Sequence, residues 1–378
     1  MKNKLLILGS VVSPCPPLFH GGTERVAYSQ AKELAKRGLK IIFVGAKGTI
    51  NNFTNQLKFE KENLEILKNI EFFEIGGGTG FGDQKDSLKI NPQTTEASRK
   101  LRLELVNISL VQKLMIEKKD EYDLILNNLR GEAILLPLAK LLGKKIINVM
   151  HLNLFPELAD IFKHYKTYLI PISNSQKELF PNLNYLPTIY NPINTKIFPF
   201  NPKPKDYALM ISTIGYHKNQ LDAILAAKKA GIKLIIAGKI RDNNYFHNHI
   251  RPHIDGKNIV YYDELNFEEK IKLYQDAKVF LFPIKWQEPF GLVVIEALAC
   301  GTPVIAYPHG GPKEIILHEK NGYLVSSVDQ MTQAIKNIEK IDRSFCRQDA
   351  VNRFDEKIIG EKYFNVLNFF FKKEINTL

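Results

Sequence analysis

Short apolar runs alternate with amphipathic stretches along the whole of this 378-residue chain. The runs are rich in Ile, Leu and Val and nearly continuous, which is typical of parallel strands buried on both faces. The stretches between them place apolar residues at helical spacing, as in 23–37, where Val26, Ala31 and Leu34 share one face and Gly38 follows. This alternation predicts an α/β fold with parallel sheets covered by helices.

The expected strands fall into two groups of six. The first group comprises 5–9, 40–45, 70–74, 123–127, 146–150 and 168–172. The second comprises 207–212, 234–238, 259–262, 279–283, 303–307 and 322–325, with helices at about 219–230, 267–277 and 291–300. Each group is large enough for a Rossmann-like sheet of its own.

A proline-rich segment separates the two groups, since 181–205 carries six prolines and several asparagines. A chain of this length exceeds what one hydrophobic core usually supports. We therefore expect a first domain at 1–185, a linker at 186–205 and a second domain at 206–357. The amphipathic C-terminal stretch at about 358–378 is expected to pack back onto the first domain. The glycine-rich segment 76–92 is expected to be a loop beside the functional site.

The chain is basic, with a formal net charge of +12, which favours anionic partners. The basic residues are scattered and form no long arm, so nucleic acid is not expected as a partner. Cys15, Cys300 and Cys346 form no metal-binding spacing and suit a reducing compartment. The first residues resemble a buried strand more than a signal peptide, and no run approaches the roughly 20 apolar residues of a spanning helix. We expect a cytoplasmic protein with at most peripheral contact at the inner face of a membrane.

The sharpest chemical signal is the segment WQEPFGLVVIE at 286–296, which follows an apolar strand and opens a helix. The N-terminus of a helix offers unpaired N–H groups and a positive dipole end, which suit a diphosphate. Gly291 lets the backbone approach a ligand closely. Glu288 and Glu296 could hold hydroxyl groups on either side of that phosphate. A glutamate pair alone is usually a solvated surface pair, but the flanking strand and turn favour a binding site.

Other phosphate-binding motifs fail on spacing. The glycines at 76–82 give no GxGxxG in register, and the sequence has no GxxxxGK[ST]. It also has no Asp-x-Asp, a carboxylate pair that commonly holds a metal ion against a diphosphate. A bound diphosphate would then be neutralised by helix ends and cationic side chains, and no cofactor or metal is expected.

At this point the chain resembles glycosyltransferase family 4, the retaining enzymes of the GT-B fold, in which two Rossmann-like domains face each other across a cleft. The family's E-x7-E element corresponds to Glu288 through Glu296. Further matches follow in the family's order, namely GGTER at 21–25, SNS at 173–175, YNPIN at 190–194, HGGPKE at 309–314 and NG at 321–322.

The resemblance implies roles for these residues. Glu288 would contact the donor sugar and Glu296 the ribose hydroxyls. The turn between them would lie against the donor sugar and diphosphate, through Phe290, Gly291 and Leu292. The N-terminal loop would close over the phosphate, through Gly21, Gly22 and Thr23.

The cationic clamp departs from the family pattern, which commonly pairs an Arg with a Lys near the first strand of the second domain. Lys218 aligns with the Lys, whereas the Arg position carries Thr213 or His217. We expect Lys218 to be the clamp, against the alternative that it caps a surface helix. His217 could add a proton-dependent contact, since histidine titrates near neutral pH.

His151 directly follows the predicted strand 146–150. Open α/β sheets bind ligands beyond the carboxyl ends of their strands, so this side chain points toward a ligand crevice. The resemblance implies a place near the donor sugar. The alternative is a hydrogen-bonded structural histidine.

The sequence therefore predicts a metal-independent, retaining hexosyltransferase that uses a nucleotide-diphosphate sugar. UDP is favoured, while GDP and ADP stay open, and the acceptor is a glycan, a lipid-linked molecule or a small molecule. The alternatives are an epimerase or phosphorylase on the same fold, and a non-catalytic relative that binds a nucleotide or glycan. The sequence leaves the oligomeric state open.

Overall fold

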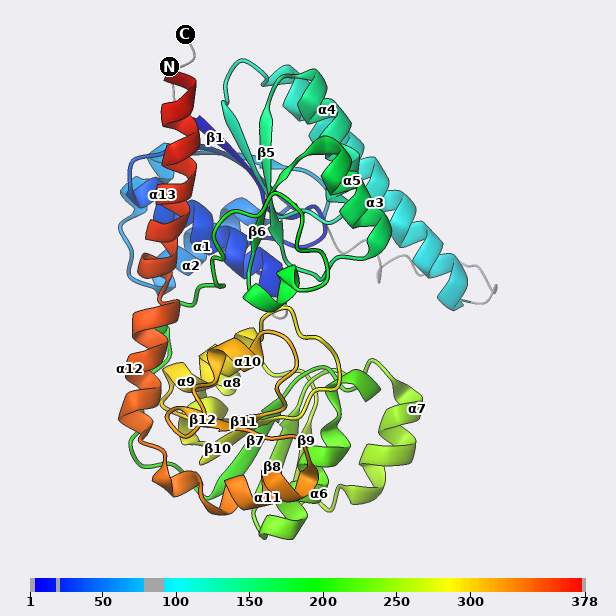
Figure 1. Ribbon diagram of the computed structural model, residues 1–378, viewed down its shortest axis with the longest axis vertical. Coiled ribbons are helices and arrows are strands. Elements are labelled where there is room, and N and C mark those ends of the chain that lie inside the picture. The colour runs from blue at the N-terminus through cyan, green and yellow to red at the C-terminus, as the bar shows by residue number, and fades with distance from the viewer. Residues whose placement is uncertain (1–3, 18–20, 78–91, 376–378) are drawn as a thin grey trace. The chain divides into compact units, whose positions relative to one another are not determined.

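The computed structural model describes residues 4–17, 21–77 and 92–375 (Figure 1). The chain divides into two compact units. The first unit contains Met1–Pro171, Phe180–Ile189 and Gly360–Leu378, and the second contains Ile172–Leu179 and Tyr190–Ile359. The chain thus passes from one unit to the other several times, and its C-terminal segment belongs to the unit that begins it.

The first unit is built on a six-stranded parallel sheet with the order β3-β2-β1-β4-β5-β6. Its strands are β1 (Lys4–Leu8), β2 (Lys40–Gly45), β3 (Ile70–Glu74), β4 (Leu124–Asn127), β5 (Lys145–Met150) and β6 (Tyr168–Pro171). The sequence prediction of these strands is confirmed, with ends that differ by one residue at most. The continuous apolar runs arise because helices cover both faces of the sheet.

The helices of this unit are α1 (Gly22–Lys36), α2 (Thr49–Phe59), α3 (Pro92–Glu117), α4 (Leu136–Leu141), α5 (Pro156–Tyr165) and most of α13 (Glu356–Ile375). Successive strand residues point to opposite faces of the sheet. Leu6 and Leu8 of β1 belong to a core cluster with Val111 of α3 and Phe162 of α5. On β2, Phe43 instead packs edge-on against a phenylalanine of α2.

The C-terminal helix α13 packs on the first unit from Gly360 onward. A Cβ at Gly360 would lie 2.5 Å from the Cβ of Glu33, so glycine lets α13 approach α1 closely. Further along, the ring of Phe370 contacts the ring of Tyr168 at a centroid distance of 4.8 Å. Amphipathic spacing alone indicated this helix, and the buried residues Tyr363 and Leu367 form its inner face.

The second unit repeats the architecture with a parallel sheet of order β12-β11-β10-β7-β8-β9. Its strands are β7 (Tyr207–Ile211), β8 (Lys233–Ala237), β9 (Ile259–Tyr262), β10 (Val279–Phe282), β11 (Val304–Ala306) and β12 (Gly322–Leu324). Its helices are α6 (Gln220–Ala230), α7 (Asn243–Tyr245), α8 (Phe267–Asp276), α9 (Leu292–Ala299), α10 (Pro312–Ile315), α11 (Val328–Lys336) and α12 (Arg343–Phe354). The predicted α/β class with two parallel sheets is confirmed.

Two sequence expectations, the glycine-rich loop and the lack of a membrane-spanning helix, can be compared only with the residues that the structure describes. The glycine-rich loop expected at 76–92 falls largely on 78–91, which lie outside them. Within the described ranges, no helix combines the length and the apolar character that crossing a bilayer requires.

Candidate active site

The second unit brings Lys218 and Glu288 together. Lys218 lies in a single helical turn, Tyr216–Lys218, after β7, and Glu288 lies in the loop after β10. Strands β7 and β10 are parallel neighbours, so the loops beyond their carboxyl ends lie at one edge of the sheet. Such an edge is where open α/β sheets bind ligands.

The Lys218–Glu288 contact is a partly buried ion pair. The Nζ atom of Lys218 lies 2.7 Å from Oε2 of Glu288, and each side chain is 15% exposed. Trp286 donates a second hydrogen bond to the same oxygen, with 2.9 Å from Nε1 to Oε2. The Lys218 ammonium also lies 4.9 Å from the centroid of the Trp286 ring, which adds a cation–π contact. No described residue donates to Oε1 of Glu288, so that oxygen keeps its lone pairs for a ligand.

The glycines of the HGGPKE element hold the backbone of the Glu288 loop. Gly311 donates its N–H to the carbonyl of Glu288 at 2.8 Å, and Gly310 forms an isolated β-bridge with Glu288. Gly310 has a positive φ of 73°, and a Cβ there would lie 2.2 Å from the Glu288 carbonyl oxygen. A Cβ at Gly311 would lie 2.3 Å from the carbonyl oxygen of Phe290. Only residues without a side chain fit this close approach.

Helix α9 begins directly after this loop. Its N-cap, Gly291, has a φ of 105° and offers no side chain to cap the helix. The first N–H groups of a helix lack partners within it, so this end can donate to an anion. The Phe290 side chain is buried and lies against the rings of Tyr190 and Phe354. Phe290 therefore supports the loop from the core, whereas Leu292 is half-buried.

Glu296, the second glutamate of the E-x7-E element, lies within α9 and is 5% exposed. Its two oxygens lie 3.0 and 2.9 Å from Nζ of Lys270, and the hydroxyl of Tyr274 donates to Oε2 at 3.0 Å. Burial and the neighbouring Glu296 charge hold the pKa of Tyr274 well above its usual range, so this hydroxyl stays protonated. Sequence reasoning missed these two partners, because they come from another helix, α8.

The remaining residues near Lys218 differ in exposure. His217 is exposed and lies edge-on to Trp286, with ring centroids 5.6 Å apart. Burial lowers the pKa of His217 and the Lys218 charge lowers it further, while Glu288 and Asp242 oppose the shift. The imidazole is therefore mainly neutral at neutral pH. Thr213, the other position aligned with the family's Arg, uses its carbonyl to accept from Gln220 at 3.0 Å.

Three of the motif segments, SNS at 173–175, YNPIN at 190–194 and HGGPKE at 309–314, contact one another through Glu314. Its carboxylate accepts the backbone N–H groups of Asn174 and Ser175 at 2.9 and 2.8 Å. The Asn174 side chain and the Tyr190 hydroxyl donate to the same carboxylate at 3.0 and 3.2 Å. Glu314 thus attaches Ile172–Leu179 to the second unit, and it acts as a structural carboxylate.

In the first unit, His151 follows β5 and is half-buried. Its Nε2 atom lies 2.8 Å from Oδ1 of Asn128, which follows the neighbouring strand β4. Burial lowers the pKa of His151 to about 3, and the charge of Arg130 adds to the shift. The imidazole is neutral across the physiological pH range.

The glycine loop at 21–23 forms the start of α1. Gly21 is the N-cap with a φ of 150°, and Gly22 and Thr23 open the helix without a side-chain cap. Behind them, Glu24 accepts a hydrogen bond from Ser10 at 3.1 Å, and Arg25 donates to the Pro17 carbonyl at 3.2 Å. Among the described residues, no side chain caps this end of α1, and the first N–H groups of a helix lack partners within it.

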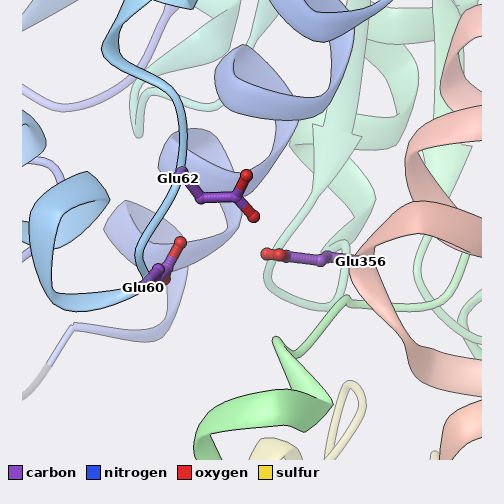
Figure 2. Close-up of side chains that lie close together, drawn as sticks. All are labelled: Glu60, Glu62 and Glu356. Atoms are coloured by element: carbon purple, nitrogen blue, oxygen red, sulfur yellow. The ribbon is translucent and has the colours of Figure 1, made fainter.

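Figure 2 shows the side chains of three glutamates, Glu60, Glu62 and Glu356, whose carboxylate oxygens are of the kind that bind metal ions. Within the first unit, Glu60 pairs with Lys32 at 2.5 Å and Glu62 pairs with Lys36 at 2.8 Å. Glu356 belongs to the second unit. Because the first two carboxylates are already matched by lysines, we assign no metal to this group.

Comparison with known proteins finds a family-model match within the second unit. Residues 193–354, less than half of the chain, match the family model of glycosyl transferases group 1. The chain is 36% identical over 98 residues to sucrose synthase isoform 1 of Daucus carota, covering 25% of this chain and 12% of that protein. It is 27% identical over 226 residues to a probable sucrose-phosphate synthase of Thermosipho melanesiensis, covering 56% and 47%. The matched part thus spans less than half of each of these relatives.

The fold is shared over nearly the whole chain. The crystal structure of Anabaena HepE in complex with UDP and glucose superimposes with a TM-score of 0.68 at 19% identity, covering 97% of this chain and 99% of that one. This chain has two parallel six-stranded sheets, and its fold matches that of this neighbour over nearly the whole chain. Residues 193–354 are thus similar to the glycosyl transferases group 1 family model, within a chain that has the GT-B fold.

Proposed function

We propose that this chain is a retaining glycosyltransferase that moves a hexose from a nucleotide-diphosphate sugar to an acceptor hydroxyl. The observation that carries the proposal is the Lys218–Glu288 ion pair. It lies beyond the carboxyl ends of β7 and β10, and Glu288 comes about one turn before the N-terminus of α9 in the chain. UDP is the favoured nucleotide, and the neighbour HepE was crystallised with UDP and glucose.

Glu288 is proposed to orient the donor sugar. Its Oε2 atom is held by Lys218 and Trp286, so Oε1 can accept a hydrogen bond from a sugar hydroxyl. Lys218 has three N–H donors, and we propose that one keeps its hydrogen bond to Glu288 while another donates to the diphosphate. The pair is only 15% exposed, so these charges act more strongly on a ligand than they would in bulk water.

The diphosphate leaves with charge developing on its oxygen. We propose that Lys218 and the open N–H groups of α9 at Gly291 and Leu292 stabilise this charge. The bond from the anomeric carbon to the phosphate oxygen breaks, and a bond to the acceptor oxygen forms on the same face of the sugar. The acceptor proton passes to the departing phosphate oxygen. This scheme requires no metal ion.

Roles for the other predicted residues rest on the same proposal. Glu296 is proposed to bind the ribose hydroxyls. Its carboxylate has about four lone-pair sites, of which Lys270 and Tyr274 occupy three, so one site is open on Oε1. His151 and the loop Gly21–Thr23 are proposed to contact the donor sugar and the phosphate. The acceptor is proposed to be a glycan, a lipid-linked molecule or a small molecule.

The proposal is tested by thermal unfolding in the presence of UDP, GDP and ADP and their common sugar conjugates, each with and without EDTA. A ligand that binds only the native state raises its stability by about 2.7 kcal/mol at 100 times its Kd. We expect a stabilising shift with one nucleotide series, unchanged by EDTA and lost in Lys218→Ala.

The matched control is Lys285→Ala, which removes an exposed lysine that lies 3.6 Å from Asp222 in the same unit. This variant should bind as the wild type does. A well-folded protein that no nucleotide stabilises would contradict the proposal.

A further inference from the structure

A pocket lined by four lysines lies at the amino ends of β5 and β6 in the first unit. Lys145 and Tyr168 begin these two strands. Lys140 lies in the last turn of α4, and Lys166 is the C-cap of α5. The lining side chains that can donate to a ligand include Lys140, Lys144, Lys145, Lys166, Tyr165 and Tyr168. No aspartate or glutamate is among the described residues that line this lysine pocket.

Three of the four lysines have no carboxylate partner. Among the described residues, Lys140, Lys144 and Lys166 form no ion pair. Lys144 donates from Nζ to the Tyr122 carbonyl at 2.6 Å, which uses one of its three N–H donors. The Lys140 ammonium lies 5.7 Å from the centroid of the Tyr165 ring, a cation–π contact that leaves its charge unneutralised. Because like charges held together repel each other, an anion bound among them would be attracted to all of them.

A cavity of the second unit shows how a pocket with matched charges differs. It is larger, at about 580 Å³, and is also lined by lysines. There, however, Lys278 pairs with Asp206 and Glu339 at 3.0 and 2.8 Å, and both carboxylates line the same cavity. Lining lysines alone therefore do not make an anion site, whereas lysines without carboxylates leave a positive field.

The helix ends at the lysine pocket do not account for its lysines. At the end of α4, the Lys144 N–H donates to the Ala139 carbonyl at 2.9 Å. At the end of α5, the Thr167 N–H donates to the Phe162 carbonyl at 3.2 Å, so backbone groups cap both helices. A helix C-terminus carries about −0.5 charge, so four ammonium groups beside two such ends leave a net charge of about +3.

The backbone that carries Lys166 is held in an uncommon conformation. Lys166 has a φ of 49° and a ψ of 38°, the left-handed region in which glycine is the usual residue at a helix end. Its carbonyl accepts a hydrogen bond from the Asn184 side chain at 2.7 Å, which fixes the turn. The ammonium of Lys166 is thus attached to a fixed point at the edge of the pocket.

We propose that the lysine pocket binds a phosphate group, carried either by a small free anion such as pyrophosphate or by an anionic lipid headgroup. Lysine binds phosphate as a point charge, and several lysines together match its multiple negative charges. The hydroxyls of Tyr165 and Tyr168 make no hydrogen bond to the described residues, so they can donate to phosphate oxygens. The cavity is about 190 Å³, below the roughly 300–1,000 Å³ of sites for drug-sized ligands, and this size favours a phosphate or pyrophosphate over a nucleotide sugar.

The lysine pocket is separate from the donor-sugar position proposed for His151. Lys145 begins β5, and His151 follows its carboxyl end. At about 3.3 Å per strand residue, the two ends lie about 20 Å apart. The phosphate site therefore does not depend on the proposed sugar transfer.

One neighbouring residue distinguishes the two sources of phosphate. Leu141 directly follows Lys140 in the chain, and its side chain is 82% exposed. An exposed apolar side chain beside cationic groups suits the surface of a bilayer, where the apolar part enters the boundary of the acyl chains. A free anion gains nothing from Leu141.

The first experiment is isothermal titration calorimetry of the full chain with inorganic pyrophosphate. All proteins carry Lys218→Ala, so that the proposed diphosphate site of the second unit does not contribute. We expect this protein to bind pyrophosphate, and the added pair Lys140→Gln and Lys166→Gln to raise Kd by about 10-fold or more. Lys140→Glu, which changes only one exposed side chain, should also raise Kd. Circular dichroism checks that each variant is folded.

The matched control adds Lys113→Gln and Lys119→Gln instead. Both lysines are exposed, belong to the first unit and lie outside the lysine pocket, so the net charge changes equally. This control should change Kd far less than the pocket variant does.

The second experiment is cosedimentation with vesicles of phosphatidylcholine, with and without phosphatidylglycerol. Binding that requires phosphatidylglycerol and falls in the pocket variant would assign the phosphate to a lipid headgroup, and Leu141→Ser should then weaken it without changing Kd for pyrophosphate. Pyrophosphate binding without vesicle binding would assign a free anion. The absence of binding to both probes, or equal effects of the pocket variant and its control, would overturn the proposal.

Discussion

The ammonium of Lys218 lies 2.7 Å from the Glu288 carboxylate, although 70 residues separate them in the chain. Strands β7 and β10 bring them together, and the Trp286 indole contacts both, donating to Glu288 and stacking on Lys218. An anionic ligand would offer Lys218 a second partner at the same edge of the sheet. In the proposed function, the pair would link sugar orientation by Glu288 to charge stabilisation by Lys218.

Trp286→Phe should lower transfer activity while leaving the fold intact. The phenyl ring retains most of the packing and the contact with Lys218, but Glu288 loses the hydrogen bond from Nε1. A hydrogen bond to a charged group contributes about 1.5–3 kcal/mol, so we expect kcat to fall by about 10-fold or more. The control is Tyr207→Phe, which removes a hydrogen bond to the Leu273 carbonyl at the opposite end of β7. Equal kcat in Trp286→Phe and the wild type would argue against this role.

Gly310→Ala should disrupt the Glu288 loop. The new Cβ would lie 2.2 Å from the Glu288 carbonyl oxygen, which forces the loop to move. Gly256→Ala is a matched control, since Gly256 has a φ of 71° against 73° for Gly310, and a Cβ there meets nothing within 4 Å. Both substitutions incur the cost of a left-handed backbone, about 1–2 kcal/mol. Only Gly310→Ala should also abolish nucleotide-induced stabilisation, and similar behaviour of the two variants would contradict the packing argument.

His151 should make stability depend on pH in a predictable direction. Its pKa is lowered to about 3 in the folded chain, whereas an unfolded histidine titrates at about 6.5. Between these values the unfolded state binds one more proton, so stability falls as the pH falls, by about 1.4 kcal/mol per pH unit. His151→Gln lacks this contribution.

Thermal unfolding followed by circular dichroism at about pH 7 and about pH 5 measures the effect. The wild type should lose more stability than His151→Gln on acidification. NMR of the same samples should find no protonation of His151 above about pH 5. A midpoint for His151 near about 6.5, the value of an unfolded histidine, would show that burial does not lower its pKa.

Glu314→Gln should loosen Ile172–Leu179. The carboxylate accepts four hydrogen bonds, two of them from the backbone N–H groups of Asn174 and Ser175. An amide presents an N–H group where one acceptor was, so we expect a loss of about 2–3 kcal/mol and faster proteolysis within this segment. Glu339→Gln breaks an exposed ion pair with Lys278 and should cost under about 1 kcal/mol. Equal protease resistance in the two variants would exclude a structural role for Glu314.

Much of the fold followed from the sequence because strand periodicity and helix spacing are local properties. The apolar runs located all twelve strands, and the turn before Gly291 located the start of α9. The same reasoning placed Lys218 and Glu288 at the carboxyl ends of strands, which is where they meet. That β7 and β10 are neighbours was not predicted from the sequence, and it comes from the strand order in the structure.

The remaining features depend on contacts between distant segments. The partners of Glu296 lie on α8, the donors to Glu314 lie more than 100 residues away, and α13 packs closely against Glu33 of α1 only because Gly360 lacks a side chain. The sequence suggested Phe290 as a ligand contact, but its ring lies in the core between Tyr190 and Phe354. The spacing of apolar residues identifies which face of a helix or strand is buried, and it does not identify the residues of other elements that pack against that face.

The proposed sugar transfer is tested most directly by the rate of nucleoside diphosphate release from the sugar conjugate that stabilises the protein, with wild type, Lys218→Ala and Lys285→Ala in parallel. Electrostatic groups of this kind contribute about 10²–10³ in kcat when removed singly. We expect a loss of that size in Lys218→Ala and a wild-type rate in Lys285→Ala. No release by the folded wild type, or equal rates in all three proteins, would contradict it.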